Sequence, residues 1–400
     1  MKRPYISSHH GSPPPTTAHW RPLRRALPTL KAMGIDSIWI PSGCKGANPS
    51  GNGYDIYDLY DLGEFDQKGS QSTRWGTKDE LLGFTSRVDE FGIGIYRDAV
   101  LNQKAGAGCL ERYPAVEVDP QDRNIGISDS DEIEGWYSPL KYNWSHFSGV
   151  DWDDSRKQKF KATLSDGKFG SLLYYLSILI PKIREIQGHR FFFVGKYRKG
   201  EIGVLLDYLE RMDYQLALFS DIYASNIHGA LVQKRPEHAV AFLTSSFTKQ
   251  PGQSLEESYA VILPRYKGQP CLFYRDLYGI EANSKPSSVP PYAFKLSTLA
   301  QARKLYANRA QRGYFDGPNR IGFVRYGNAR HPSGLACILS NAGPSRKRMY
   351  LGRAHSGQQW TDILNSRTEA IKISRKYISL SCYHILVLIK ILKRRTYTQK

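Results

Sequence analysis

Residues 20–41 read WRPLRRALPTLKAMGIDSIWIP, and this stretch contains the unit from which the fold is predicted. Its apolar residues fall about one helical turn apart as far as Met33, so the spacing predicts a helix that ends at Gly34. The short apolar run that follows, Ile35–Pro41, predicts a buried strand. A helix joined to a buried strand by a short connection is typical of a parallel sheet with helices on its outside.

The same alternation of helix and strand continues to about residue 304. Predicted helices include KDELLGFTSRVDEFG (78–92), LLYYLSILIPKIREIQ (172–187) and GVLLDYLERM (203–212). Predicted strands include GIGIYRDAVLNQ (92–103), FFFVGKY (191–197), YQLALFS (214–220), AVAFL (239–243) and PCLFY (270–274). This many strand–helix units favours a barrel over an open sheet. From about residue 305 short strands with turns predict a separate antiparallel β-domain.

The composition is that of a globular protein, since 40% of the 400 residues are hydrophobic and 23% are charged. The net charge of +19 permits attraction to nucleic acid, but the basic residues are scattered and only Arg346–Arg348 and Leu392–Arg395 form dense clusters. We therefore expect no nucleic-acid partner. We also expect no membrane partner, because the apolar run Ile378–Ile391 is too short for a normal membrane span.

The cysteines and the N-terminus bear on the cellular compartment. The five cysteines are far apart and form no CxxC pair, which argues against a zinc site and against a disulfide scaffold. The first 20 residues lack the apolar stretch of a secretory signal. A reducing, cytoplasmic location is the expectation that follows.

In a parallel barrel the chemistry lies at the carboxyl ends of the strands. The predicted strand ends are Pro41-Ser42, Asn102-Gln103, Lys196-Tyr197, Ser220-Asp221, Thr244–Phe247 and Arg275-Asp276. This set is poor in carboxylates and contains no histidine, and the chain has no HExxH or GxSxG motif. The residues by themselves therefore predict a groove and no recognisable active site.

Several segments of the chain resemble the alpha-amylases of glycoside hydrolase family 13, and the resemblance is to the bacterial-type amylases that also occur inside fungal cells. The matching segments, in the same order and at the same spacing, are Gly51–Leu81, Asp98–Gly108, Ala115–Asn124, His146–Lys157, Gln250–Glu256 and Ser333–Arg353. The resemblance implies an α/β fold: a (β/α)8-type TIM barrel, an excursion called domain B after the third strand, and a C-terminal antiparallel β-domain. It also implies retaining hydrolysis of α-1,4-glucan, that is, starch or glycogen.

We expect the barrel to be incomplete. The chain is divided into a disordered leader (1–18), the first part of the barrel (19–102), a shortened and irregular domain B (103–160), the rest of the barrel (161–304) and a C-terminal β-domain with a divergent tail (305–400). The fourth strand of the family has no counterpart, the leader replaces the first strand, and the tail replaces the closing strands of the β-domain. About six barrel strands remain, and the gap is closed either by direct pairing of 92–102 with 191–197 or by the apolar segment 172–181.

The catalytic positions implied by the resemblance are degenerate. A retaining glycosidase needs two carboxylates about 5 Å apart, one as nucleophile and one as acid/base. The family's acid lies in a Val-Gly-Glu-Tyr motif that here reads Val-Gly-Lys-Tyr, with Lys196 in its place, and the nucleophile's motif on the fourth strand is absent. Phe247 stands where an aspartate steadies the strained sugar, and Gln103 replaces a histidine that contacts it. An ammonium is a poor proton donor at neutral pH, and ~4 Å from a cationic sugar ring it would oppose the transition state by about 4 kcal/mol at an effective dielectric near 20.

The resemblance also implies the groups that contact substrate and metal. Tyr54 matches a tyrosine that stacks on the sugar, and Asp98 normally faces the arginine that this chain has lost. Trp75 is the third candidate for substrate contact, with a purely structural role as the alternative. Asn102 matches a ligand of the family's calcium ion, but its partners lie in the missing region. Because calcium needs six to eight oxygens, we expect it not to be retained.

Four readings stay open. The favoured one is a degenerate relative of alpha-amylase that binds α-glucan weakly and does not cleave it. The second is a decayed gene product or a faulty gene model, without a stable fold. The third is an active glucan hydrolase, either with displaced catalytic groups or, if the gene model is faulty, with the fourth strand and its nucleophile restored. The fourth is a basic protein that binds nucleic acid or a membrane surface.

Overall fold

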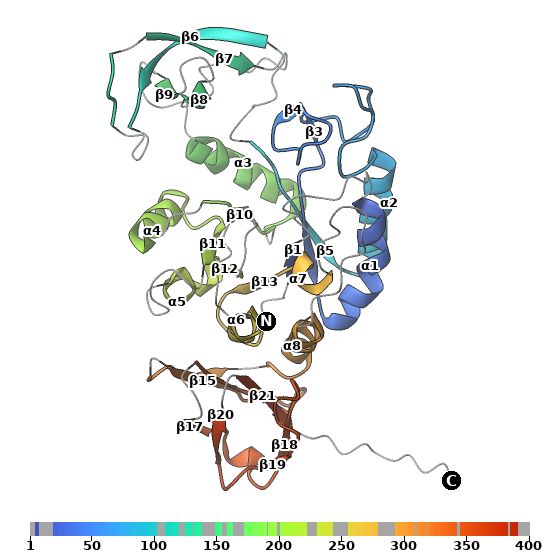
Figure 1. The fold of residues 1–400 in the computed structure, drawn as a ribbon, viewed down its shortest axis with the longest axis vertical. Helices are drawn as coiled ribbons and strands as arrows, with labels where there is room; N and C mark the ends of the chain where they lie inside the picture. The colour runs from blue at the N-terminus through green and yellow to red at the C-terminus, as the bar shows by residue number, and fades with distance from the viewer. Residues whose placement is uncertain are drawn as a thin grey trace.

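The structure is a computed structural model of the 400-residue chain. It describes residues 5–7, 19–101, 109–119, 125–129, 131–137, 149–153, 158–162, 172–189, 191–197, 201–221, 230–242, 255–278, 293–308, 310–317, 319–341, 345–382 and 385–390. Figure 1 shows three regions: a parallel sheet flanked by helices in the middle, a small β-sheet above it and an antiparallel β-domain below it. Among the described residues no helix is long and apolar enough to cross a membrane.

The middle region is built on a seven-stranded parallel sheet in the order β10-β11-β12-β13-β1-β2-β5. Its strands are β1 (Tyr5–Ser7), β2 (Ser37–Ile40), β5 (Gly94–Arg97), β10 (Val194–Gly195), β11 (Ala217–Asp221), β12 (Ala239–Phe242) and β13 (Gln269–Phe273). The last of these strands along the chain, β13, pairs with the first, β1. Pairing of the last strand with the first is how a barrel closes, so the predicted incomplete barrel with its C-terminal β-domain is confirmed.

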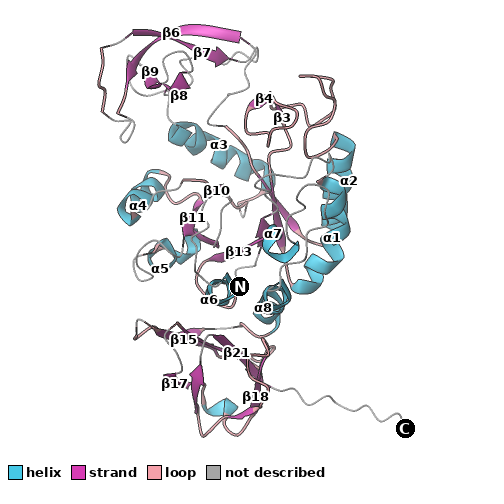
Figure 2. Cartoon of the chain, in the orientation of Figure 1, coloured by secondary structure: helices cyan, strands magenta, loops and turns pink. Residues whose placement is uncertain are grey.

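Helices surround this sheet (Figure 2). They are α1 (Trp20–Met33), α2 (Lys78–Glu90), α3 (Leu172–Gln187), α4 (Ile202–Arg211), α5 (Leu231–Lys234), α6 (Leu255–Ile262), α7 (Tyr274–Tyr278) and α8 (Ala293–Leu305), with a 3₁₀ turn at Pro236–His238. A second 3₁₀ turn, Arg353–His355, lies in the C-terminal domain. Helix α1 ends as predicted, because Gly34 adopts a left-handed conformation (φ 93°) and its N–H bonds back to Leu30 and Lys31. Helix α2 begins with a capping box, in which the Thr77 hydroxyl accepts from the Glu80 N–H and the Glu80 carboxylate accepts from the Thr77 N–H.

Among the described residues the barrel is open between β5 and β10. These strands form the two ends of the sheet, and they follow one another among its strands along the chain. The described residues show no pairing between them, although the rings of Tyr96 and Phe192 meet edge to face at 5.7 Å. Ile180 of helix α3 packs with Leu205 and Leu218 and does not fill the gap. Neither predicted way of closing the gap is therefore seen in the part of the chain that the structure describes.

The N-terminal leader differs from the prediction at residues 5–7. These residues form β1, in which Tyr5 lies opposite Ser37 of β2 and Cys271 of β13. Without β1, two neighbouring strands would each present a row of unpaired backbone groups, so even three residues gain full pairing here. The expectation of a disordered leader is therefore wrong for 5–7, and the described barrel strands number seven instead of six. The rest of the leader lies outside the described residues.

The excursion after β5 is a sheet and not the irregular segment that was expected. It contains β6 (Cys109–Glu117), β7 (Asp131–Tyr137), β8 (Gly149–Asp153) and β9 (Gln158–Ala162), in the order β7-β6-β9-β8. All its pairings are antiparallel. Its sequence is rich in charged residues and its alternating stretches are short, as at Val116–Asp119, so pairing between distant segments supplies the order that local preference alone does not.

The C-terminal domain also differs at its end. Its strands are β14 (Gln311–Tyr314), β15 (Arg320–Arg325), β16 (Leu335–Ser340), β17 (Ser345–Tyr350), β18 (Gln359–Asp362), β19 (Ile371–Lys372), β20 (Tyr377–Cys382) and β21 (Ile385–Lys390). Six of them form a sheet in the order β14-β15-β16-β21-β18-β19, and β17 pairs with β20. The tail was expected to leave this domain without its final strands, but β20 and β21 belong to the sheets, and β21 lies between β16 and β18. The apolar run ILVLIK supplies the burial that a central strand requires.

Candidate functional site

Four side chains meet at the carboxyl ends of three barrel strands. Trp39 lies on β2, Asp98 follows β5 and Lys196 follows β10, while Tyr54 reaches them from the connection between β3 (Lys45–Gly46) and β4 (Ile56–Asp58). We call these four residues the Asp98 cluster. It spans the gap between β5 and β10, which are the two end strands of the sheet that the structure describes.

Asp98 is the centre of the cluster. The Tyr54 hydroxyl donates to Oδ2 at 2.6 Å, and the Trp39 indole N–H donates to Oδ1 at 2.8 Å. The Lys196 ammonium lies 3.6 Å from Oδ2, 5.0 Å from the centre of the Tyr54 ring and 5.6 Å from that of Trp39. Both carboxylate oxygens are therefore engaged, and the lysine faces the carboxylate together with two aromatic rings.

Burial sets the electrostatics of this cluster. Burial first, then the negative charge of Asp98 and the hydrogen bond to it, raise the pKa of Tyr54 far above its ordinary value. Tyr54 therefore stays a neutral hydrogen-bond donor throughout the physiological range. Asp98 is mostly buried, with 16% of its side chain exposed, whereas Lys196 is 44% exposed and faces solvent.

The chemistry open to the cluster is binding. Its accessible groups are the exposed Lys196 ammonium and the half-buried ring of Tyr54, and flat aromatic faces suit sugar rings. The Tyr54 and Trp39 donors are already bonded to Asp98, and the Trp39 ring is only 7% exposed. The cluster does not contain the pair of carboxylates that retaining hydrolysis requires. A second buried carboxylate, Asp276 on α7, accepts from the Tyr259 hydroxyl at 2.5 Å and belongs to the core beside β13.

A separate hollow lies on the outer face of the barrel. It is lined by Arg21, Arg24, Arg25, Pro28 and Arg87 of α1 and α2. This lining contains no aromatic ring and no carboxylate, so it lacks the groups that stack on or accept hydrogen bonds from sugars. We therefore place the candidate site at the strand ends and not in this hollow.

Comparison with proteins of known function identifies the family. No protein-family model matches the chain. The chain is 32% identical to the alpha-amylase of Bacillus licheniformis over 445 positions, which cover 89% of this chain and 86% of the relative. The chain belongs to the alpha-amylase family. The glucan 1,4-alpha-maltohexaosidase of Bacillus sp. (strain 707) is similar to the same degree, with 32% identity and the same coverage, and the cytoplasmic alpha-amylase of Escherichia coli (strain K12) is 27% identical over 88% of this chain and 91% of the relative.

Solved structures of alpha-amylases share the fold. An Anoxybacillus alpha-amylase superposes with a TM-score of 0.63 at 11% identity, and the alpha-amylase of Geobacillus thermoleovorans complexed with acarbose does so with a TM-score of 0.60 at 11% identity. Each comparison covers 98% of both chains. The sequence alignment to the B. licheniformis alpha-amylase spans 445 positions, more than the 400 residues present, so that alpha-amylase carries segments that this chain lacks.

The predicted site residues of this alpha-amylase relative fall into two groups. The structure brings Tyr54, Asp98 and Lys196 together, whereas Trp75 is 2% exposed and donates its indole N–H to the Asn52 carbonyl at 3.2 Å. The ring of Trp75 also meets His19 edge to face at 5.2 Å, and these contacts favour the structural one of its two predicted roles. Three further predicted residues lie outside the described part of the chain: Asn102, Gln103 and Phe247.

Trp39 is the member of the cluster that sequence reasoning missed. The signal that could have found it is its place two residues before the end of the predicted strand Ile35–Pro41, near the carboxyl end where chemistry is expected. In the structure Trp39 stacks on Phe219 at 4.8 Å. The calcium prediction rests on Asn102 and so stays a prediction. Among the residues that the structure describes, no group of three or more His, Cys, Asp or Glu side chains lies close enough to hold a metal.

Proposed function

We propose that this alpha-amylase relative binds α-1,4-glucan weakly at the Asp98 cluster and does not hydrolyse it. The observation that carries the proposal is the contact of Lys196 with Asp98 at 3.6 Å. It puts an ammonium at the position where the family resemblance predicts the general acid, beside the tyrosine that the resemblance assigns to sugar stacking. A cation at this point opposes a cationic sugar ring and cannot replace a carboxylic acid.

Two further observations support the proposal. The relatives' names describe enzymes that act on α-glucan, and the chain is similar to them over 89% of its length. The described strands of the barrel leave a gap between β5 and β10, where the family's nucleophile-bearing strand is expected. Loss of a general acid alone costs a factor of about 10²–10⁴ in rate, and without the nucleophile the two-step reaction has no covalent intermediate.

We further propose a cytoplasmic location. One relative is named as a cytoplasmic alpha-amylase. Cysteines 44, 271, 337 and 382 are free and buried in the structure, as in proteins of reducing compartments.

Affinity electrophoresis in gels containing soluble starch tests the binding. We expect the parent chain to be retarded by starch and the Tyr54→Ala variant to lose most of that retardation, because it lacks the ring and the hydroxyl that faces Asp98. Tyr60→Ala is the matched control, since Tyr60 lies in the same loop and is 78% exposed. Equal migration of the parent and Tyr54→Ala at every starch concentration would contradict the proposed site.

A reducing-sugar assay on soluble starch tests the absence of hydrolysis. We expect no release above the no-enzyme control. Release by the parent that disappears in Tyr54→Ala would show that the chain is an active hydrolase with displaced catalytic groups. The transcript around codons 160–175 separates this alternative from a missing segment, because a skipped exon there would restore the fourth strand and its nucleophile.

A further inference from the structure

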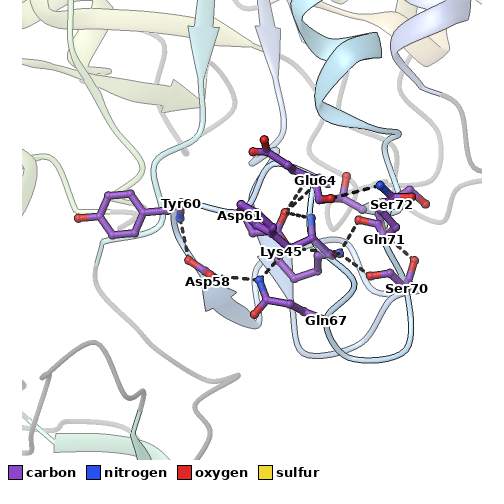
Figure 3. A network of polar contacts seen from close by, with 12 residues as sticks. Lys45, Asp58, Tyr60, Asp61, Glu64, Gln67, Ser70, Gln71 and Ser72 are labelled. Carbon is purple, nitrogen blue, oxygen red and sulfur yellow. Dashed lines mark hydrogen bonds and ion pairs between the residues drawn. The ribbon is translucent and has the colours of Figure 1, made fainter.

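Lys45 is a charged side chain held almost entirely inside the protein. Only 1% of it is exposed, and its ammonium donates to the backbone carbonyls of Phe65, Ser70 and Gln71 at 3.1, 2.7 and 2.6 Å. The carboxylate of Asp61, itself fully buried, lies 3.4 Å away. Figure 3 shows Asp61, Ser70 and Gln71 gathered around the lysine.

This environment resembles a binding site for a cation. An ammonium has three N–H donors and no acceptor, and three backbone carbonyls take all three. The negative charge of Asp61 balances the positive charge, as a buried ion pair requires. A bound metal cation would find the same ligands here, namely carbonyl oxygens and one carboxylate. Lys45 supplies that cation from within the chain.

Asp61 is organised to stay ionised. Burial alone would raise its pKa, but backbone N–H bonds from Glu64, Gly63 and Phe65 together with the charge of Lys45 outweigh burial and lower it. The amide of Gln67 donates to the other carboxylate oxygen at 3.0 Å. The ion pair therefore joins β3 to the loop at residues 61–71, which has little strand pairing of its own.

The same lysine is connected to Tyr54. Its backbone lies in β3, which pairs with β4, and Tyr54 lies in the connection between these two strands. The Lys45 N–H also donates to the Asp61 carbonyl at 2.8 Å, so side chain and backbone hold the same two segments together. Residues 61–71 are therefore held to β3, the strand from which the connection that carries Tyr54 begins.

We propose that Lys45 is a positioning residue, a tethered cation that folds the loop at residues 47–72 and thereby holds Tyr54 against Asp98. The part that concerns glucan binding rests on the proposed function. The part that concerns the order of the loop does not, so the two can fail separately.

Hydrogen exchange on peptides from residues 47–75 tests the proposal in Lys45→Ala, with the global unfolding temperature measured alongside. We expect these amides to exchange at least tenfold faster than in the parent. Addition of propylammonium, which replaces the atoms removed beyond Cβ, should restore slow exchange, whereas tetramethylammonium, which has no N–H donor, should not. Lys68→Ala is the matched control, because Lys68 is an exposed lysine of the same loop, with its ammonium over the Tyr57 ring, 4.3 Å from the ring centre.

Unchanged exchange in Lys45→Ala, or equal restoration by tetramethylammonium, would overturn the proposal. Should Lys45→Ala fail to fold, Asp61→Asn removes the charge balance while keeping the volume, and we expect it to accelerate exchange in the same peptides. Retardation in starch gels is the second readout, and it should be lost in Lys45→Ala and recovered with propylammonium. A parent that does not bind starch would refute the proposed function, while the exchange result would still decide the role of Lys45.

Discussion

Lys196 places a positive charge in the candidate site without disrupting the strands around it. Its ammonium lies beside Asp98 and faces the rings of Tyr54 and Trp39. A positively charged sugar ring would be stabilised by the same carboxylate and aromatic rings. Under the proposed function, the ammonium therefore occupies the position at which hydrolysis would develop positive charge on the sugar. Because Lys196 is 44% exposed, solvent screens the ion pair and its contribution to stability is small.

Lys196→Glu tests this view at the level of the residue. We expect the variant to release no reducing sugar from starch, because a retaining reaction needs a nucleophile as well as an acid. We also expect a loss of about 1 kcal/mol in the free energy of unfolding, since an attractive exposed pair becomes a repulsive one. Lys196→Gln is the control that removes the pair without adding negative charge. Appreciable starch hydrolysis by Lys196→Glu would show that a nucleophile exists elsewhere in the chain.

At the scale of the element, β21 combines an apolar sequence with a central position in its sheet. Its residues alternate between two cores, with Leu386 and Leu388 packing beside Trp360 and Val387 packing toward the barrel helices. Pairing with β16 on one side and β18 on the other satisfies its backbone. The strand is therefore a central support of the C-terminal domain and not an appended tail.

Leu388→Ala measures that support. The side chain is fully buried, so we expect the C-terminal domain to lose about 2–5 kcal/mol, the usual cost of a large-to-small change in a core. Hydrogen exchange in peptides from residues 359–390, measured against urea concentration, would record the loss in this domain, because six of the seven tryptophans lie outside it and would dominate a fluorescence signal. Leu305→Ala is the matched control, because Leu305 is 48% exposed and the same truncation there should cost much less. Equal losses in the two variants would mean that β21 is not packed as described.

At the scale of the whole molecule, the gap between β5 and β10 in the described barrel is the feature that most favours aggregation. Strands β5 and β10 each present an edge that the described residues leave without a strand partner. Apolar side chains adjoin one of these edges, since Phe191 is 41% exposed and is followed by two more phenylalanines. Exposed edges with apolar residues of high β-propensity favour pairing between molecules.

Phe191→Lys should reduce aggregation of the parent chain while changing its unfolding temperature little, because a charged residue beside an edge opposes edge-to-edge pairing. Static light scattering against protein concentration would measure the effect. Phe294→Lys is the control, since Phe294 is 64% exposed on α8, away from the open edge. A monomeric parent with strong, uniform amide protection across 92–101 and 191–197 would mean that the barrel closes by another route.

Local patterns were sufficient for the elements that carry their own signals. Helix α1 ends at Gly34 and helix α2 begins after Thr77, and each of these residues caps its helix through short-range hydrogen bonds. Apolar runs predict the buried strands, and the order and spacing of the motifs indicate the family. Those motifs also single out Tyr54, Asp98 and Lys196.

Only the tertiary structure decided which segments become partners. Residues 5–7 carry no strong strand signal, yet they are held between β2 and β13 because two open edges meet there. Lys45 has no local feature that marks it, and its burial depends on carbonyls 20 to 26 residues further along the chain. Short-range preferences act along the chain, whereas edge pairing and the burial of a charge are settled by whatever lies across the fold, and that is the information that a linear pattern does not contain.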